Sequence, residues 1–303
     1  MGDAASQPRR YADEVTANCE RVLVTLMSRL GPQKESFFLV GGLTPRYLVK
    51  ARPPEVPPHG GTGDIDVVVD VAVLAGAEAY RTLEENLRRM GFAPVINAKG
   101  NAVTWRWRIE VAAHQSVILE FLAEHPKRAP GQTRALPEEQ GVTAVNIPHA
   151  SMVIDLHDRQ EVTAELLGGD GVSTQIIAHA NLVSFICLKA FAMDQRREDK
   201  DAHDLVYCLR YVEGGLERAV ADFAAGLEGA HGKTIADALA ILRRQFAGDG
   251  PVEGYNRPGP MAVARYDLGA ADANREARAL RQREASGLVE MFLERLAAWG
   301  LRA

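Results

Sequence analysis

The chain has 303 residues, of which 47% are hydrophobic, so it can bury a sizeable core as one large domain or two of moderate size. Its formal net charge of -5 at pH 7 argues against a surface that binds nucleic acid all over and allows only a local basic patch. No run approaches the roughly 20 apolar residues that span a bilayer, and the opening residues lack the apolar core of a signal peptide. We therefore expect a globular, cytoplasmic protein that has no membrane contact.

The first half of the chain alternates helical and extended patterns. Residues 11–30 carry apolar side chains at near-helical spacing and stop before a glycine-proline pair, which predicts an N-terminal helix. The stretch SFFLVGG, residues 36–42, predicts a short buried strand that ends in two glycines, and residues 43–51 predict a brief helix. A loop rich in proline and glycine, residues 52–63, then leads into the strand TGDIDVVVD at residues 62–70.

The rest of the chain changes from mixed to helical character. The patterns predict a helix at 76–91, paired strands at 102–113 and 116–124, a polar loop at 124–142, and a small hairpin of 151–157 with 161–166. From about residue 176 the pattern is helical, with helices at 181–194, 201–212, 216–227 and 233–246 and a long last helix ending near Trp299. The sequence thus predicts an α+β fold, a small mixed sheet flanked by helices in residues 1–175 and a helical domain in residues 176–303.

The three cysteines, Cys19, Cys187 and Cys208, lie far apart in the sequence. Two of them fall within apolar helical patterns, where a free thiol behaves as a small hydrophobic side chain. The sequence therefore indicates neither disulfide bonds nor zinc.

Two carboxylates stand one residue apart in TGDIDVVVD. An extended backbone points alternate side chains to the same face, so Asp64 and Asp66 should project together while Ile65 and Val67 project to the other face. Carboxylates this close repel each other unless one is protonated, a cation pairs with them, or a metal ion lies between them. A solvated strand end with two ordinary acids is the alternative interpretation.

Two neighbouring elements add to this pair. The strand that ends in Gly41-Gly42 and leads into a helix would let backbone amides approach a phosphate, although a tight turn explains two glycines equally well. Glu120 lies within an apolar strand, where an isolated carboxylate is costly to bury, so it is the candidate third acid. Glu110 on the preceding strand is its rival, because the sequence does not fix the strand register.

The helical half supplies cations. Lys189 occupies a position on the apolar stripe of its helix, which suggests an inward lysine with an anionic partner or a side chain at the edge of the stripe. In the charged stretch DQRREDKDAHDL, Arg197 with Asp201 or Lys200 with Asp204 can pair at i, i+4, as on a solvated helix face.

The order of these pieces resembles the DNA-polymerase-beta-like nucleotidyltransferase superfamily, and within it the abortive-infection (AbiEii-type) nucleotidyltransferases. The matching segments span about residues 36–210 and are LVGGLTPRYLV, TGDIDVVVD, VILEFL, FICLKAFA and RREDKDAHDL. The resemblance implies that Asp64, Asp66 and Glu120 are catalytic and bind Mg2+. It implies that the nucleotide is bound by Gly41, Gly42, Thr44, Lys189 and Arg196, with Asp201 and Asp204 orienting the cations.

The sequence departs from the family pattern at two positions. Many members carry a serine or threonine directly after the two glycines, where this chain has Leu43 and then Thr44. A basic residue expected two positions after the arginine is Glu198. Both changes bear on phosphate affinity more than on the metal site.

The resemblance implies Mg2+-dependent transfer of a nucleoside monophosphate from a nucleoside triphosphate to an acceptor hydroxyl. It implies a toxin-like protein that acts on tRNA or another macromolecule and has a cognate antitoxin as partner. A small-molecule acceptor is a variant that suits an acidic chain. The alternative from another class is a catalytically weak protein of the same fold that binds a nucleotide or a partner chain for regulation.

Overall fold

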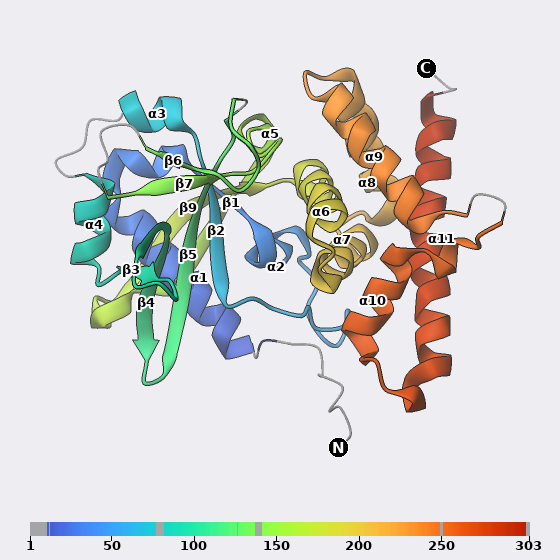
Figure 1. The fold of residues 1–303 in the computed structure, drawn as a ribbon, viewed down its shortest axis with the longest axis horizontal. Helices are drawn as coiled ribbons and strands as arrows, with labels where there is room; N and C mark the ends of the chain where they lie inside the picture. The colour runs from blue at the N-terminus through green and yellow to red at the C-terminus, as the bar shows by residue number, and fades with distance from the viewer. Residues whose placement is uncertain are drawn as a thin grey trace. The chain divides into compact units, whose positions relative to one another are not determined.

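The computed structural model describes residues 11, 13–76, 82–125, 127–136, 141–248 and 251–300. By its internal contacts the chain forms two compact units (Figure 1). The sheet unit consists of Tyr11–Tyr47 and Gly61–Asn181, and the helical unit contains Leu48–Gly60 and the chain from Leu182 onward. The predicted class, a mixed sheet with helices followed by a helical C-terminal region, is confirmed.

The sheet unit is built on one mixed sheet whose main path runs β3-β4-β5-β2-β1-β9-β8, with β7 pairing β5 and β6 pairing β7. The centre of the path alternates in direction: β1 and β2 are antiparallel, whereas β2 and β5 are parallel. The strands are β1 Phe37–Val40, β2 Asp64–Val69, β3 Ala93–Ile96, β4 Ala102–Ala112, β5 Gln115–Ala123, β6 Thr133–Ala135, β7 Thr143–Asn146, β8 His157–Glu165 and β9 Val172–Ala180.

Short helical segments connect these strands, and one long helix precedes them. The α-helices are α1 Asp13–Arg29, α2 Pro45–Leu48, α3 Val71–Gly76, α4 Leu83–Arg89 and α5 Met152–Asp155, and the 3-10 turns are η1 Gly31–Ser36, η2 Gly41–Leu43 and η3 Leu167–Gly169. Helix α4 begins with a capping box between Thr82 and Glu85, which satisfies two backbone amides that the first turn leaves unpaired. Its end is marked by Gly91, whose φ of +93° suits a glycine.

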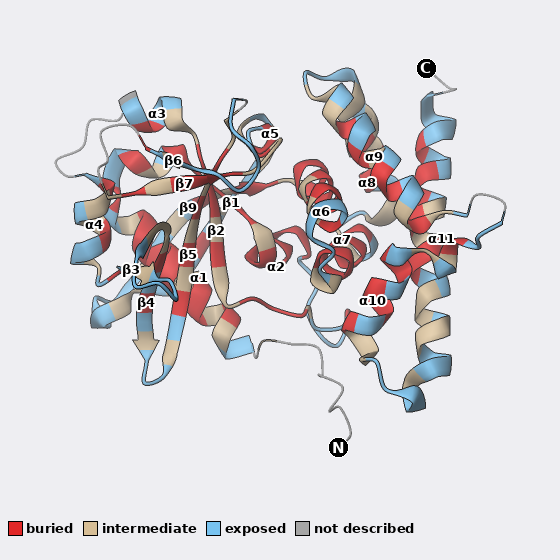
Figure 2. Cartoon of the chain, in the orientation of Figure 1, coloured by how far each residue is buried: buried red, intermediate tan, exposed pale blue. Residues whose placement is uncertain are grey.

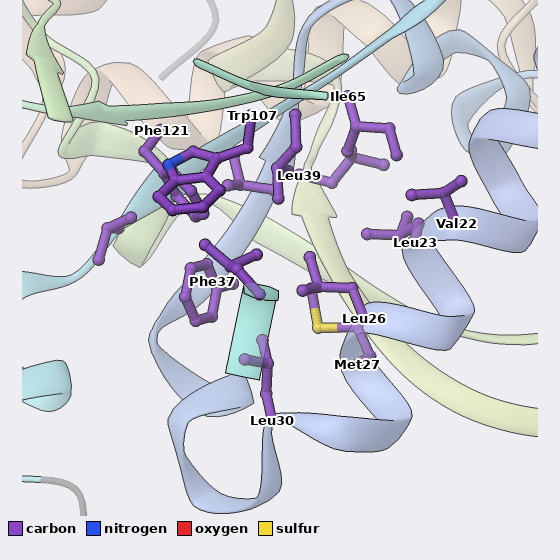
Figure 3. Packing of buried hydrophobic residues seen from close by; sticks show 14 of the residues in the cluster. Val22, Leu23, Leu26, Met27, Leu30, Phe37, Leu39, Ile65, Trp107 and Phe121 are labelled. Atoms are coloured by element: carbon purple, nitrogen blue, oxygen red, sulfur yellow. The ribbon is translucent and has the colours of Figure 1, made fainter. Parts of the chain in front are cut away.

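One face of the sheet packs on α1. Leu23 and Leu26 of α1 lie against Leu39 and Ile65 of the central strands, and Trp107 of β4 completes this layer (Figure 3). All five side chains have no measurable exposure. Burial of each such side chain contributes about 1.5–3 kcal/mol, so this layer fixes which face of β2 is turned inward.

The helical unit consists of six α-helices among the described residues: α6 Leu182–Arg196, α7 Asp199–Tyr211, α8 Gly215–Glu228, α9 Gly232–Phe246, α10 Pro258–Leu268 and α11 Arg275–Gly300. Two 3-10 turns, η4 Gly254–Asn256 and η5 Asp272–Asn274, lie beside α10. Figure 2 shows α6 and α7 largely buried, whereas both ends of α11 are exposed. Within the parts of the chain that are described, no helix is long and apolar enough to cross a bilayer.

The proline-rich segment Leu48–Gly60 belongs to the helical unit, although sheet-unit residues flank it in the sequence. The hydroxyl of Tyr207 donates to the carbonyl oxygen of Pro57 at 3.0 Å, and His59 lies 2.8 Å from Asp204. Lys50 adds an exposed ion pair with Glu213. These contacts hold the backbone of Leu48–Gly60 in one conformation although most of it has no regular secondary structure.

The structure corrects the predicted hairpin of 151–157 with 161–166. Residues 152–155 form α5 instead, and β8 pairs along its whole length with β9. A turn with Gly168, Gly169 and Gly171 at positive φ reverses the chain between these strands. The helical region therefore begins at Leu182 and not at about residue 176, because residues 172–180 are extended.

Other differences concern strands that the sequence did not predict and the boundary between the two units. β6 lies inside the predicted loop 124–142, and β3 was not predicted at all. Of the helix predicted at 76–91, the structure describes α4, while residues 77–81 lie outside the described residues. The compact units also differ from the predicted segments 1–175 and 176–303, since a boundary at residue 175 would cut β9, and Leu48–Gly60 packs with the helices.

Candidate functional site

The two acids of β2 lie on the face of the sheet opposite the α1 layer. Asp64 and Asp66 are half-buried, while Ile65 and Val67 between and after them are fully buried in the core, as the alternation predicts. In the ladder Asp66 stands between Val40 of β1 and a residue of β5. The position of the pair is thus set by burial of the other face of the same strand.

Glu120 is the β5 residue directly beside Asp66. The parallel pairing of β2 with β5 places these two residues in register, so their side chains share one face. Arg106, the β4 partner of Glu120 on its other side, brings Nε to 2.8 Å from Oε1 of Glu120. Glu110 is opposite Ser116 and remains exposed, so the register selects Glu120 as the third acid.

The electrostatics of Glu120 reflect this crowding. Burial is the largest influence and the charge of Asp66 the next, and together they raise the pKa of Glu120 to about 8 against the lowering effect of Arg106. A side-chain hydrogen bond with Asp66 and the charge of Asp64 act in the same direction as burial. The three carboxyl groups therefore form one interacting set.

The turn after β1 approaches this set closely. Gly41 has a φ of +70°, and a Cβ atom built on it would lie 1.9 Å from Oδ2 of Asp66. Only glycine fits a position that is both left-handed and this close to a carboxylate. Next in the chain, Leu43 is fully buried in the core, and Thr44 is fully buried with no hydrogen-bond partner for its hydroxyl among the described residues.

The donor set suits a hard divalent cation. Asp64, Asp66 and Glu120 offer only carboxylate oxygens, the ligands that Mg2+ prefers. A cation among them would remove the mutual repulsion that raises the pKa of Glu120. The residues present therefore fit the Mg2+ that the family resemblance implies.

This crowding predicts an unusual dependence of stability on pH when Mg2+ is absent. Folded Glu120 keeps its proton up to about pH 8, whereas in the unfolded chain it loses the proton near its ordinary pKa of 4.5. Between these values the folded state binds more protons, so the contribution of Glu120 to the free energy of unfolding falls as pH rises. We expect urea unfolding in EDTA to show this fall for the wild type and a flatter profile for Glu120→Gln; identical profiles would contradict it.

A second cluster of the predicted residues lies in the helical unit. Lys189 of α6 places Nζ 3.0 Å from Oδ1 of Asp201 and 2.7 Å from Oδ2 of Asp204. Arg196 binds Asp201 through two nitrogens at 2.7 and 2.8 Å, and Lys200 lies 2.8 Å from Asp204. Lys189 is therefore an inward lysine with anionic partners, one of the two alternatives that the sequence left open.

Of the two pairs expected at i, i+4, the structure has Lys200 with Asp204. Arg197 has a φ of +54° and lies between α6 and α7, so the helical spacing to Asp201 does not apply there. Arg196 takes that aspartate instead. The interruption between the end of α6 and the start of α7 decides this pairing.

The neighbouring charges in this cluster shift the pKa values of its members strongly. Burial alone would raise the pKa of Asp204, but Lys189, Lys200 and His59 hold it well below the ordinary value. Burial likewise opposes the charged form of Lys189, yet Asp204 and Asp201 raise its pKa. For His59 burial outweighs Asp204, so its pKa is lowered. The cluster is thus an ion network with a neutral imidazole at its edge.

The predicted site residues therefore fall into two groups, one in each unit. Gly41, Gly42, Thr44, Asp64, Asp66 and Glu120 belong to the sheet unit, and Lys189, Arg196, Asp201 and Asp204 belong to the helical unit. Sequence reasoning missed Arg106 and His59. Arg106 lies on the same face of β4 as Arg108, so the alternation of side chains along the strand could have pointed to it. No local signal marks His59.

The sequence NREARALRQRE at residues 274–284, which reaches into α11, is rich in arginine and could contact RNA or form a solvated helix, and three of its arginines have partners within the protein. Nε of Arg281 lies 2.7 Å from Asp267, and Arg278 donates to the carbonyl oxygen of Gly269 at 3.2 Å. The guanidinium of Arg283 lies over the ring of Tyr255, 4.9 Å from its centroid. These contacts hold Arg278, Arg281 and Arg283 against other residues of the helical unit.

No protein-family model matches this sequence, and a search of curated proteins finds no match either. The resemblance to nucleotidyltransferases therefore rests on the motif residues alone.

Proposed function

We propose that this protein is a Mg2+-dependent nucleotidyltransferase. It transfers a nucleoside monophosphate from a nucleoside triphosphate to an acceptor hydroxyl: the hydroxyl oxygen bonds to the α-phosphorus and gives its proton to solvent, the bond from the α-phosphorus to the α,β-bridging oxygen breaks, and pyrophosphate leaves. Mg2+ held by Asp64, Asp66 and Glu120 would neutralise the charge of the triphosphate and lower the barrier to attack.

One observation carries the proposal, the approach of Gly41 to Asp66. Its left-handed φ and the 1.9 Å distance from a Cβ position to the carboxylate mean that the backbone at the turn lies against a carboxylate side chain. A turn that served only to reverse the chain would not need this proximity, whereas backbone amides beside a metal-binding acid could hold the phosphates that the metal neutralises.

The chain's own residues would divide the work between binding and positioning. Arg106 orients Glu120 and partly offsets its burial. Gly42 and Thr44 belong to the proposed phosphate-binding turn, and the buried hydroxyl of Thr44 has no hydrogen-bond partner within the described part of the chain. Within the helical unit, Asp201 and Asp204 fix the positions of Lys189 and Arg196.

The proposal extends to the acceptor and to the partner of the enzyme. We propose a cytoplasmic, toxin-like enzyme with a cognate antitoxin, acting on tRNA, another macromolecule or a small molecule. Because Arg278, Arg281 and Arg283 already have partners within the protein, we propose that any RNA acceptor contacts other residues than these three. A labelled-nucleotide screen against tRNA and cell extract would identify the acceptor.

A second candidate function is a catalytically weak nucleotide-binding protein. Leu43 is buried in the core where the family places a phosphate-binding hydroxyl, and the ammonium of Lys189 is occupied by two aspartates. Both features reduce the groups that are ready to bind a triphosphate. Such a protein would act normally in cells with both β2 acids replaced, whereas an enzyme would not.

The nucleotide site is tested by calorimetry. Each nucleoside triphosphate is titrated into the protein with Mg2+, beside the double variant Asp64→Asn/Asp66→Asn and the control Asp70→Asn. Asp70 follows the same strand, and its Oδ1 accepts amide hydrogens from Ala72 and Val73, a role that asparagine can keep. We expect Mg2+-dependent binding that only the double variant abolishes.

Failure of the wild type to bind any nucleoside triphosphate would overturn the transferase proposal. Binding that survives the double substitution would also overturn it, because the nucleotide would then bind without the proposed metal ligands.

A further inference from the structure

Three potential metal ligands converge in the helical unit, apart from the acids of the sheet. His59 comes from the proline-rich segment Leu48–Gly60, whereas His203 and Asp204 are consecutive residues of α7. One ligand atom of each lies within 4.8 Å of the other two. His203 and Asp204 are buried, and the side chain of His59 is 14% exposed.

One ring nitrogen of His203 is buried and finds no hydrogen-bond partner in the part of the chain that the structure describes. Its Nδ1 lies 2.7 Å from Oδ1 of Asp267, which Arg281 holds in turn at 2.7 Å. Among the described residues, Nε2 of His203 has no hydrogen-bond partner, although the residue is only 4% exposed. An unpaired buried nitrogen costs free energy, so a ligand for Nε2 would offset a real penalty.

The arrangement around His203 is the one that metal-binding histidines usually show. A carboxylate on one ring nitrogen fixes the tautomer and the ring orientation and leaves the other nitrogen's lone pair for the metal. Here Asp267 is that carboxylate, and its own pairing with Arg281 fixes it in place. Rings of Tyr266 and His59, with centroids 4.4 and 5.4 Å away, keep His203 from rotating.

We propose that His59, His203 and Asp204 form a binding site for Zn2+, distinct from the carboxylate set on β2 and β5. Two imidazole nitrogens and one carboxylate oxygen suit a borderline divalent metal and are poor ligands for Mg2+. Nε2 of His59 and Oδ1 of Asp204 already lie 2.8 Å apart, close to the separation of two ligands on one ion. A fourth position remains for water or a substrate group.

The neighbouring lysines set the strength of this site. Lys189 contacts Oδ2 of Asp204, whereas Lys200 reaches both oxygens, at 3.0 and 2.8 Å. Lys200 is the more exposed of the two, at 22% against 8%, and is therefore the one that can withdraw when the metal binds. Without metal, its ammonium supplies the positive charge beside Oδ1.

The test is calorimetric titration of Zn2+ into the untagged, chelator-treated full chain in the presence of excess Mg2+. We expect one Zn2+ per chain, with affinity lost in His203→Gln and in His59→Gln. Asp267→Asn should weaken binding by about 10- to 100-fold, the usual effect of removing the partner of a ligand histidine. Lys200→Gln should tighten binding, by up to about fivefold for a partly exposed ion pair. Co2+ as a probe should give the visible absorption of a tetrahedral site.

Three controls make the result decisive. His231→Gln, in the same unit but outside the cluster, and Asp64→Asn/Asp66→Asn in the sheet unit should leave the Zn2+ stoichiometry unchanged. Circular dichroism without metal shows whether His203→Gln still folds, and His59→Gln, at the less buried histidine, gives a second result if it does not. No Zn2+ binding, or binding that either folded histidine variant retains, would overturn the proposal whatever the outcome of the nucleotide titrations.

Discussion

Gly41→Ala is expected to weaken Mg2+-dependent nucleotide binding while leaving the protein folded. A left-handed φ of +70° costs an alanine about 1–2 kcal/mol. In addition, the new methyl group would lie 1.9 Å from Oδ2 of Asp66, so the carboxylate must move. Because Asp66 is one of the three proposed metal ligands, we expect nucleotide affinity to fall at least about tenfold, as for a perturbed metal ligand.

Gly100→Ala separates the two effects. Gly100 has a similar φ of +80°, but a Cβ atom there would meet nothing within 4 Å. Urea unfolding should therefore show a loss of about 1–2 kcal/mol in both variants from backbone strain, while calorimetry should show a loss of nucleotide affinity in Gly41→Ala alone. If both variants bound nucleotide equally well, the approach of the turn to Asp66 would have no part in binding.

Lys189→Met is expected to be among the most destabilising single substitutions in the helical unit. Lys189 is only 6% exposed and is the shared partner of Asp201 and Asp204, which are 1% and 0% exposed. Methionine keeps much of the volume of the side chain but leaves the two buried carboxylates short of one positive charge. Removing one partner of a buried ion pair costs about 3–5 kcal/mol, and we expect that loss in the free energy of unfolding.

Lys233→Met is the matched control for this measurement. Lys233 makes an i, i+4 pair with Asp237 at 2.8 Å, but its side chain is 89% exposed, so the loss should stay below about 1 kcal/mol. Adding Asp204→Asn to Lys189→Met should return part of the loss, since it removes one of the uncompensated charges. Equal losses for Lys189→Met and Lys233→Met would show that the buried network contributes no more than a surface pair.

The local features of this protein could be predicted from its sequence. Asp64 and Asp66 share a face because side chains alternate along any strand, and Ile65 and Val67 decide which face is buried. The N-terminal helix and the pairing of β4 with β5 follow likewise from periodicity over a dozen residues. Even the inward position of Lys189 was one of two alternatives that its helical spacing allowed.

Only the tertiary structure decided which distant residues meet. The choice of Glu120 over Glu110 depends on the register of β5 against β2, which hydrophobic patterning within one strand does not fix. The pairing of β9 with β1, which lies far from it in the sequence, is likewise not marked by any pattern within residues 172–180. His59 joins His203 and Asp204 across more than a hundred residues because the proline-rich segment packs on the helices. Alternation and helical spacing are properties of neighbouring residues and can be read along the chain, whereas register, ion partners and converging ligands arise only when packing selects one of many possible long-range contacts.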